Sequence, residues 1–131
     1  GQLLYVMADI LCLRFDIMEK RLISSYDEES DTFVGKVVGE HGYVADYGIS
    51  DDIFLNIDKN NMPTSVFVRN ASEVFNVSGK SLQDGNVRIC ISCNDECLSF
   101  RMFVENSEIC SLRRRNDFGI PASQYLMDCN I

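Results

Sequence analysis

Basic residues are scarce in this sequence. Lysine and arginine number 12 against 20 aspartates and glutamates, which gives a formal net charge of −8 and a pI near 4.5. A surface that holds nucleic acid by charge alone is normally basic. The composition therefore argues against tight, nonspecific nucleic-acid binding. The imbalance lies in the first half, because residues 1–60 hold 12 acids and five bases whereas residues 61–131 hold eight acids and seven bases.

Histidine and proline are also rare, with one and two residues respectively. The single histidine, His41, lies next to Glu40 in a glycine-flanked segment, and no nucleophile with an orienting acid can be assembled around it from the spacing. We therefore expect no enzymatic activity. With few prolines and 46% apolar residues, the 131-residue chain is expected to be a folded domain rather than disordered.

No apolar run is long enough to cross a membrane. The most apolar segment, residues 3–21, is interrupted by Asp9, Arg14 and Asp16. Its apolar residues recur at helical spacing, which predicts an amphipathic helix of about five turns within residues 1–22. Because the apolar band is wide, we expect this helix to contact a protein partner or a second copy of the chain.

Two short motifs suggest ligand chemistry, and both fail on spacing. Cys90, Cys93 and Cys97 resemble a zinc knuckle, but residues three apart on a strand point to opposite faces. Residues 79–81, Gly-Lys-Ser, lack the glycine that a phosphate loop needs five residues earlier, because Val74 stands there. We expect neither a metal nor a cofactor. No secretory leader precedes the six cysteines, so we expect them to be reduced.

Patterns of period two dominate the middle of the sequence. They follow an acidic segment that we expect to be a solvated linker, residues 23–32. The sequence predicts a mainly β fold, with a small five- to six-stranded barrel over residues 33–105 and a C-terminal extension over residues 106–131. This extension could contain a short helical turn at ASQYLMDC, and it could equally be ordered or frayed. The strands are expected within residues 32–39, 42–49, 52–57, 65–70, 86–93 and 97–104.

The barrel resembles a cold-shock domain, a version of the OB fold. SVFVRNASEV, residues 65–74, and KSLQDGNV, residues 80–87, are similar to the third strand and the start of the fourth strand of that family, and residues 35–37 to its first strand. The second strand could be residues 41–46 or residues 52–57, and the register stays open. The resemblance implies binding of single-stranded nucleic acid on outward aromatic and basic side chains.

The order of segments is also similar to that at the start of Armitage-type RNA helicases of small-RNA (piRNA) silencing pathways. The shared short motifs follow an apolar helix and a polar linker, and they are Gly35-Lys36-Val37, Asp46-Tyr47-Gly48-Ile49, Asp52-Ile53-Phe54 and Leu82–Val87. This resemblance implies a non-catalytic accessory module of an RNA-silencing helicase, with the ATPase outside this sequence. It also implies a cytoplasmic location, more specifically in perinuclear or mitochondrion-associated RNA granules.

The candidate binding residues are aromatic and basic. Tyr43 or Phe54, with Phe67, could stack on bases, and Lys36, Arg69 and Arg88 could contact phosphates. Arg113, Arg114 and Arg115 form a further cluster that could face phosphates or a protein.

Three functions fit these residues. The acid excess and the few aromatics favour a protein-interaction module that uses the helix or the acidic first half. Weak binding of single-stranded RNA is the alternative, and dimerisation through the helix is the third. The orientation of Phe67 discriminates between them: if Val66 and Val68 are buried, strand alternation turns Phe67 outward beside Arg69, which favours RNA.

Overall fold

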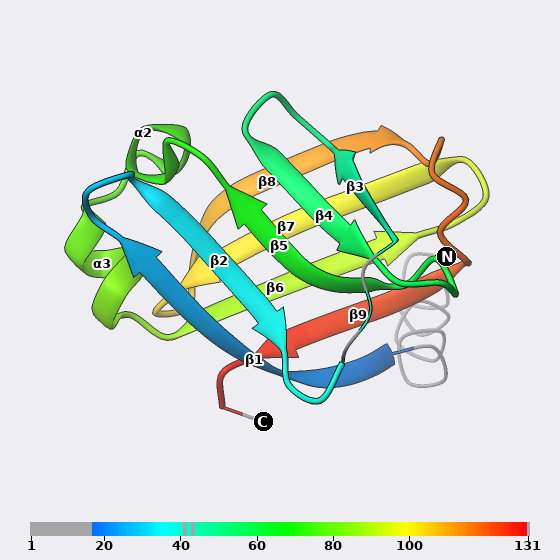
Figure 1. Cartoon of the computed structure of the whole chain (residues 1–131), viewed down its shortest axis with the longest axis horizontal. Coiled ribbons are helices and arrows are strands. Elements are labelled where there is room, and N and C mark those ends of the chain that lie inside the picture. Colours follow the sequence, from blue (N-terminus) through cyan, green and yellow to red (C-terminus); the bar gives the residue numbers. More distant parts are fainter. Residues whose placement is uncertain (1–16, 41, 43, 131) are drawn as a thin grey trace, which may run out of the picture.

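The computed structural model describes residues 17–40, 42 and 44–130, which form a curled sheet with two short helices (Figure 1). The sheet order is β3-β4-β5-β2-β1-β9-β6-β7-β8. All neighbouring strands are antiparallel except β1 and β9, which are parallel. The elements are β1 Ile17–Asp27, β2 Thr32–Val37, β3 Ala45–Gly48, β4 Ile53–Ile57, β5 Pro63–Val68, α2 Ala71–Phe75, α3 Gly79–Asp84, β6 Val87–Cys93, β7 Cys97–Val104, β8 Ser107–Arg115 and β9 Ser123–Asp128.

The predicted five- to six-stranded OB or cold-shock-like barrel is wrong. The described residues are mainly β, but their nine strands form one mixed half-barrel sheet. Residues 106–131, expected to be an extension, supply β8 and β9, and the ASQYLMDC stretch is a strand rather than a helical turn. Both segments proposed for the second cold-shock strand contribute strands, because β3 and β4 pair as a hairpin.

The predicted helix is also wrong where the structure describes it, because residues 17–27 form β1. This strand includes residues 23–27 of the predicted linker, and residues 28–31 form the turn that follows it. Met18, Leu22 and Tyr26 lie on the buried side of this strand. A spacing of four residues fits both a helix and a strand, so these positions do not separate the two periods. The remainder of the predicted helix, residues 3–16, lies outside the described residues.

The core fills the inside of the curl. β3, β4, β5 and β2 form one layer and β9, β6, β7 and β8 the other, with β1 between them in the sheet order (Figure 1). A Cβ placed on Gly35 of β2 would lie 3.1 Å from Leu22 Cδ1 and 3.5 Å from Ile89 Cδ1 of β6, so the layers are in close contact there. Phe33 and Phe100, one from each layer, are fully buried in this core.

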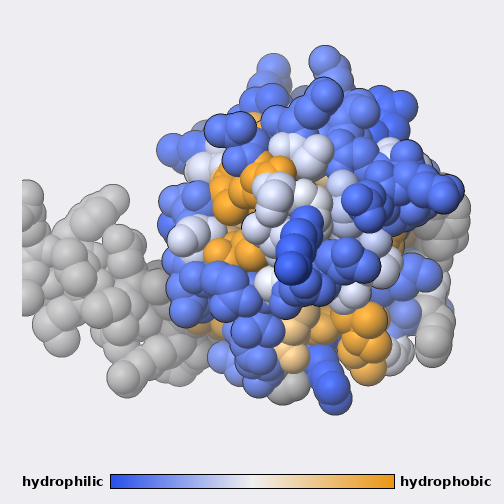
Figure 2. Space-filling model, turned by 90° about the vertical axis from the view of Figure 1, so that its left-hand side faces the viewer, coloured by the Kyte–Doolittle hydropathy of each residue, from blue (hydrophilic) through white to orange (hydrophobic). Residues whose placement is uncertain are grey.

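The helices cover one end of the curl, where they bury Ala71, Phe75 and Leu82. Seen from that side, the surface is mostly hydrophilic, and its hydrophobic parts form separate patches (Figure 2). The two edges of the sheet are linked by contacts of their own. Arg114 Nε donates to the Ile49 carbonyl at 2.8 Å, and the Tyr47 ring stacks on Phe118 with centroids 4.6 Å apart.

A hydrogen-bond network fastens the turn between β1 and β2 to α2. Asp31 accepts a hydrogen bond from the Tyr26 hydroxyl at 2.6 Å, and its two carboxylate oxygens accept from the Ser72 backbone N–H at 3.0 Å and the Ser72 hydroxyl at 2.8 Å. The bond to Asp31 raises the pKa of Tyr26 to about 12. The same bond, with those from Ser72, holds the pKa of Asp31 below its ordinary value.

The hydrogen bond from Tyr26 to Asp31 should make the free energy of unfolding depend on pH in the alkaline range. The folded pKa of Tyr26 is raised from 10.0, so its contribution to the free energy of unfolding is complete below about pH 10 and is lost as the pH rises toward 12. In urea unfolding at about pH 8, we expect the free energy of unfolding of wild type to be larger than that of Tyr26→Phe. This difference should shrink by about pH 11. A difference that stays constant over this range would show that the Tyr26 hydroxyl does not titrate with unfolding.

Candidate functional site

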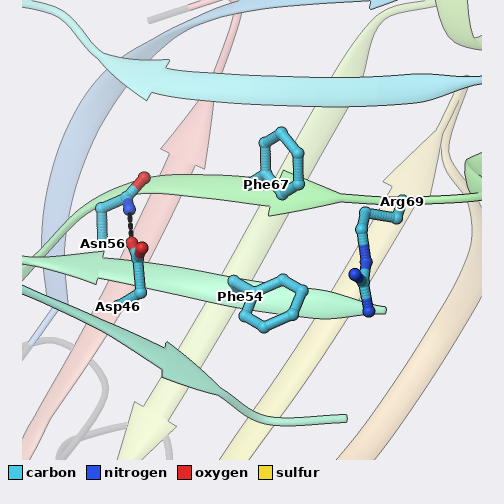
Figure 3. Close-up of a pocket in the computed structure, with 5 residues that line it drawn as sticks. All are labelled: Asp46, Phe54, Asn56, Phe67 and Arg69. Atoms are coloured by element: carbon cyan, nitrogen blue, oxygen red, sulfur yellow. Dashed lines mark hydrogen bonds between the residues drawn. The ribbon is translucent and has the colours of Figure 1, made fainter. Parts of the chain in front are cut away.

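Phe54 and Phe67 form an aromatic pair on the outer face of β4 and β5. They lie directly opposite each other in the antiparallel pairing, with ring centroids 6.2 Å apart and planes tilted by 56° (Figure 3). Both rings are half-buried, whereas Val66 and Val68, the neighbours of Phe67 along β5, are fully buried. Phe67 therefore faces outward, as strand alternation predicts once Val66 and Val68 fill the core.

Arg69 lies at one end of the aromatic pair. Its guanidinium carbon is 5.1 Å from the centre of the Phe54 ring. Arg69 Nη2 donates to the Asp51 carbonyl at 2.6 Å, and Nε lies 3.8 Å from Asp52 Oδ1. The side chain is still 54% exposed, so the guanidinium is positioned by these contacts and remains open to an anion.

Polar side chains lie at the other end. The Asn56 side-chain N–H donates to the Asp46 carboxylate (Figure 3), and the Asn56 amide oxygen accepts a hydrogen bond from the Ser65 hydroxyl. A shallow hollow of about 360 Å³ runs from this end to Arg69, and its chemistry changes along its length from acceptors and an amide, through two rings, to a cation. The hollow is lined by Asp46, Phe54, Asn56, Phe67 and Arg69, which we call the aromatic face.

The flanks of the aromatic face are set by its cross-strand neighbours. Gly48 stands opposite Phe54 on β3, and a Cβ built there would lie 3.4 Å from Phe54 Cε1, so glycine leaves this side of the ring uncovered. Lys36 on β2 pairs with Ser65 and is exposed on the same outer face. Within the described residues, Lys36 forms no ion pair with a carboxylate.

The other predicted residues lie elsewhere. Arg88 is on the outer face of β6, in the opposite layer from the aromatic pair, and its guanidinium carbon is 4.8 Å from the centre of the Phe103 ring. Arg113 and Arg115 are exposed at the end of β8, whereas Arg114 holds the Ile49 carbonyl at the sheet edge. Tyr43 lies outside the described residues.

The sequence reasoning missed Asp46 and Asn56. Asn56 is two residues after Phe54, so strand alternation within β4 places both on one face, and this signal could have identified it. Asp46 could not be found in this way, because its position depends on the pairing of β3 with β4.

The cysteines that resemble a zinc knuckle lie on the hairpin of β6 and β7. Cys93 is buried and Cys90 half-buried, on alternate faces of β6, as the spacing predicts. Burial raises the pKa of the Cys93 thiol to about 11 and also raises that of Cys90, so both thiols stay protonated at neutral pH. Over residues 17–40, 42 and 44–130, no three His, Cys, Asp or Glu side chains are grouped to hold a metal ion.

Comparison with known proteins gives no match. No family model fits the chain, and neither a curated protein nor a solved structure matches it. None of the helices described by the structure is long and apolar enough to cross a membrane.

Proposed function

We propose that this chain is a non-catalytic module that binds single-stranded RNA weakly on the aromatic face. The observation that carries the proposal is the outward pair of Phe54 and Phe67 with Arg69 over one ring. A core needs no aromatic side chains on its solvent side. Two adjacent rings beside an exposed arginine provide the combination on which proteins stack successive bases and hold the backbone between them.

The chemistry of the face fits a single strand. Each ring can stack one base, worth about 1–3 kcal/mol, and Arg69 and Lys36 can contact the adjoining phosphates. Asn56 and Asp46 can hydrogen-bond the edge of a base, which is accessible only in unpaired RNA. Among the described residues two cations, Arg69 and Lys36, adjoin the rings, and the net charge of the chain is −8, so the binding should be weak and salt-dependent.

The proposed parent is an RNA-silencing helicase of the Armitage type. This proposal is supported by the order of the shared motifs in the sequence and by their position in the fold. Two of these motifs contain Asp46, Gly48 and Phe54, and all three residues lie at or beside the aromatic face. The resemblance and the face thus point to the same hairpin, β3 and β4.

Protein docking is the second candidate function. The excess of acidic residues in the composition favours it. Ile23 is 60% exposed and stands opposite Lys36, which adds apolar surface next to the aromatic face that a protein could cover. Dimerisation through the predicted N-terminal helix concerns residues that are mostly outside the described part of the chain.

Strand selectivity tests the proposed function. Fluorescence anisotropy would be measured with a labelled RNA of about 12 nucleotides, alone and annealed to its complement, at two salt concentrations. We expect the single strand to bind and the duplex to bind at least about tenfold more weakly, because pairing hides the base faces. Equal binding of both would indicate backbone attraction without stacking. The absence of binding at the highest protein concentration would favour protein docking.

A further inference from the structure

We propose that the bound strand continues from the aromatic face, across β1, onto a second surface that carries four arginines. This inference rests on the proposed function and adds the path of the RNA. The second surface, which we call the arginine face, is the outer side of β1, β9, β6, β7 and β8 at Arg21, Arg88, Arg101 and Arg113.

Strand pairing places these arginines on one surface. Arg21 of β1 pairs with Asp128 of β9, Asp128 pairs with Arg88 of β6, and Arg88 pairs with Phe103 of β7. Directly paired residues project to the same side of a sheet. The row therefore runs across four strands on the outer face, and it contains two arginines, one aromatic ring and one acid.

The arginine face repeats the chemistry of the aromatic face. Two guanidinium groups lie over the Phe103 ring, with the guanidinium carbon of Arg88 at 4.8 Å and that of Arg101 at 5.0 Å from its centre. Phe54 and Arg69 form the same kind of contact in the other layer. Phe103 and Arg88 are half-buried and Arg101 is exposed, so the planar guanidinium groups over this ring are partly open to solvent and can stack on a base or contact a phosphate.

Most arginines of the arginine face form no ion pair with a carboxylate of the described residues. Arg101 pairs with Glu108 at 2.9 Å. Among the described residues, none of the other three arginines, Arg21, Arg88 and Arg113, forms an ion pair. Glu19 and Asp27 on β1 and Asp128 on β9 are the acids on the outer side of the strands that join the two faces.

The two faces are connected through β1. Lys36 of β2 pairs with Ile23 of β1, and Arg21 follows on the same side of β1 two residues earlier. In Figure 1, β1 and β9 run along the lower side of the molecule, between the front layer and the layer behind it. From β5 to β6 the sheet order has four strand spacings, or about 19 Å along the sheet. A strand of several nucleotides can follow this path, and OB folds hold a comparable length of about 4–16 nucleotides.

The test compares RNAs of two lengths. Anisotropy would be measured with labelled single strands of about 5 and about 12 nucleotides, on wild type and on the double variant Arg21→Gln with Arg88→Gln. The control is Lys59→Gln with Lys80→Gln, which removes the same charge from two exposed positions off the path. Thermal unfolding midpoints would verify that both double variants are folded.

We expect wild type to bind the longer strand more than tenfold more tightly than the shorter one. The arginine variant should lose about tenfold on the longer strand only, and its salt slope on that strand should fall by about 1.4, or about 0.7 per phosphate contact. The lysine control should match wild type on both lengths.

Two outcomes would overturn the inference. If the shorter strand binds as tightly as the longer one, or if the arginine variant behaves like the lysine control, the RNA does not reach the arginine face, although the proposed function stands. If neither strand binds wild type, both the path and the proposed function are wrong.

Discussion

Replacing Phe54 and Phe67 together with alanine should weaken binding of single-stranded RNA at least about 30-fold. Each ring stacks one base, and truncation of such a platform costs about 1–3 kcal/mol per base. Two rings thus account for at least about 2 kcal/mol, which is a factor of about 30 in the dissociation constant. Each single variant should show part of this loss. Anisotropy titration of a strand of about 12 nucleotides measures it.

The matched control for this variant is Phe118→Ala. Phe118 is also half-buried, but it stacks on Tyr47 at the sheet edge and does not line the aromatic face. We expect Phe118→Ala to bind RNA like wild type. If the control loses as much affinity as the double variant, the loss reflects general destabilisation, and the assignment of stacking to Phe54 and Phe67 is wrong.

Phe100→Ala should destabilise the fold more than any of the surface substitutions. Phe100 is fully buried on the inner face of β7, and truncation of a buried phenylalanine costs about 3–5 kcal/mol because it loses apolar burial and leaves a cavity. Phe103, on the outer face of the same strand, is the matched control. Phe103→Ala should cost about 1 kcal/mol or less, mainly from its contacts with Arg88 and Arg101.

Urea unfolding of the two variants tests the curled sheet directly. The structure predicts a single transition for both, with a large shift of the midpoint for Phe100→Ala alone. Equal costs for the two substitutions would contradict the assignment of inner and outer faces along β7. That assignment also places Arg101 on the arginine face, because residues 101 and 103 lie on the same side of the strand.

Local pattern predicted the strands in the middle of the chain and failed toward its ends. β2, β4, β6 and β7 have alternating apolar side chains because one face of each is buried. β3 is polar with no fully buried residue, and β5 is buried on both faces over residues 63–66. β8 does not alternate cleanly, because the pairing shifts between Met102 and Phe103 and Ile109 is inserted opposite them. In β9 the inward residues Ser123 and Tyr125 are polar or partly polar, which weakens the apolar signal.

The sheet topology could not be predicted from pattern at all. β1 and β9 pair in parallel although they come from opposite ends of the described chain. Such long-range pairing depends on the packing of the whole core and leaves no local mark. The resemblance to a five-stranded barrel rested on short sequence motifs. These motifs fit hairpins of the larger sheet equally well.

The site was partly predictable for the same reason. The outward direction of Phe67 follows from alternation within one strand, and Arg69 is two residues further on the same side. The contact of Arg69 with Phe54 depends on the register of β4 against β5, which the sequence left open. Register therefore converts separate candidate residues into one face.

The most direct test of the account is to map where RNA contacts the protein. The full chain, labelled with ¹⁵N, would be titrated with an unlabelled single strand of about 12 nucleotides while backbone amide shifts are followed. We expect the largest changes at Phe54, Phe67 and Arg69 on β4 and β5, and smaller ones along β1 toward Arg88. Changes confined to the end covered by α2 and α3, or no changes at saturating RNA, would contradict it.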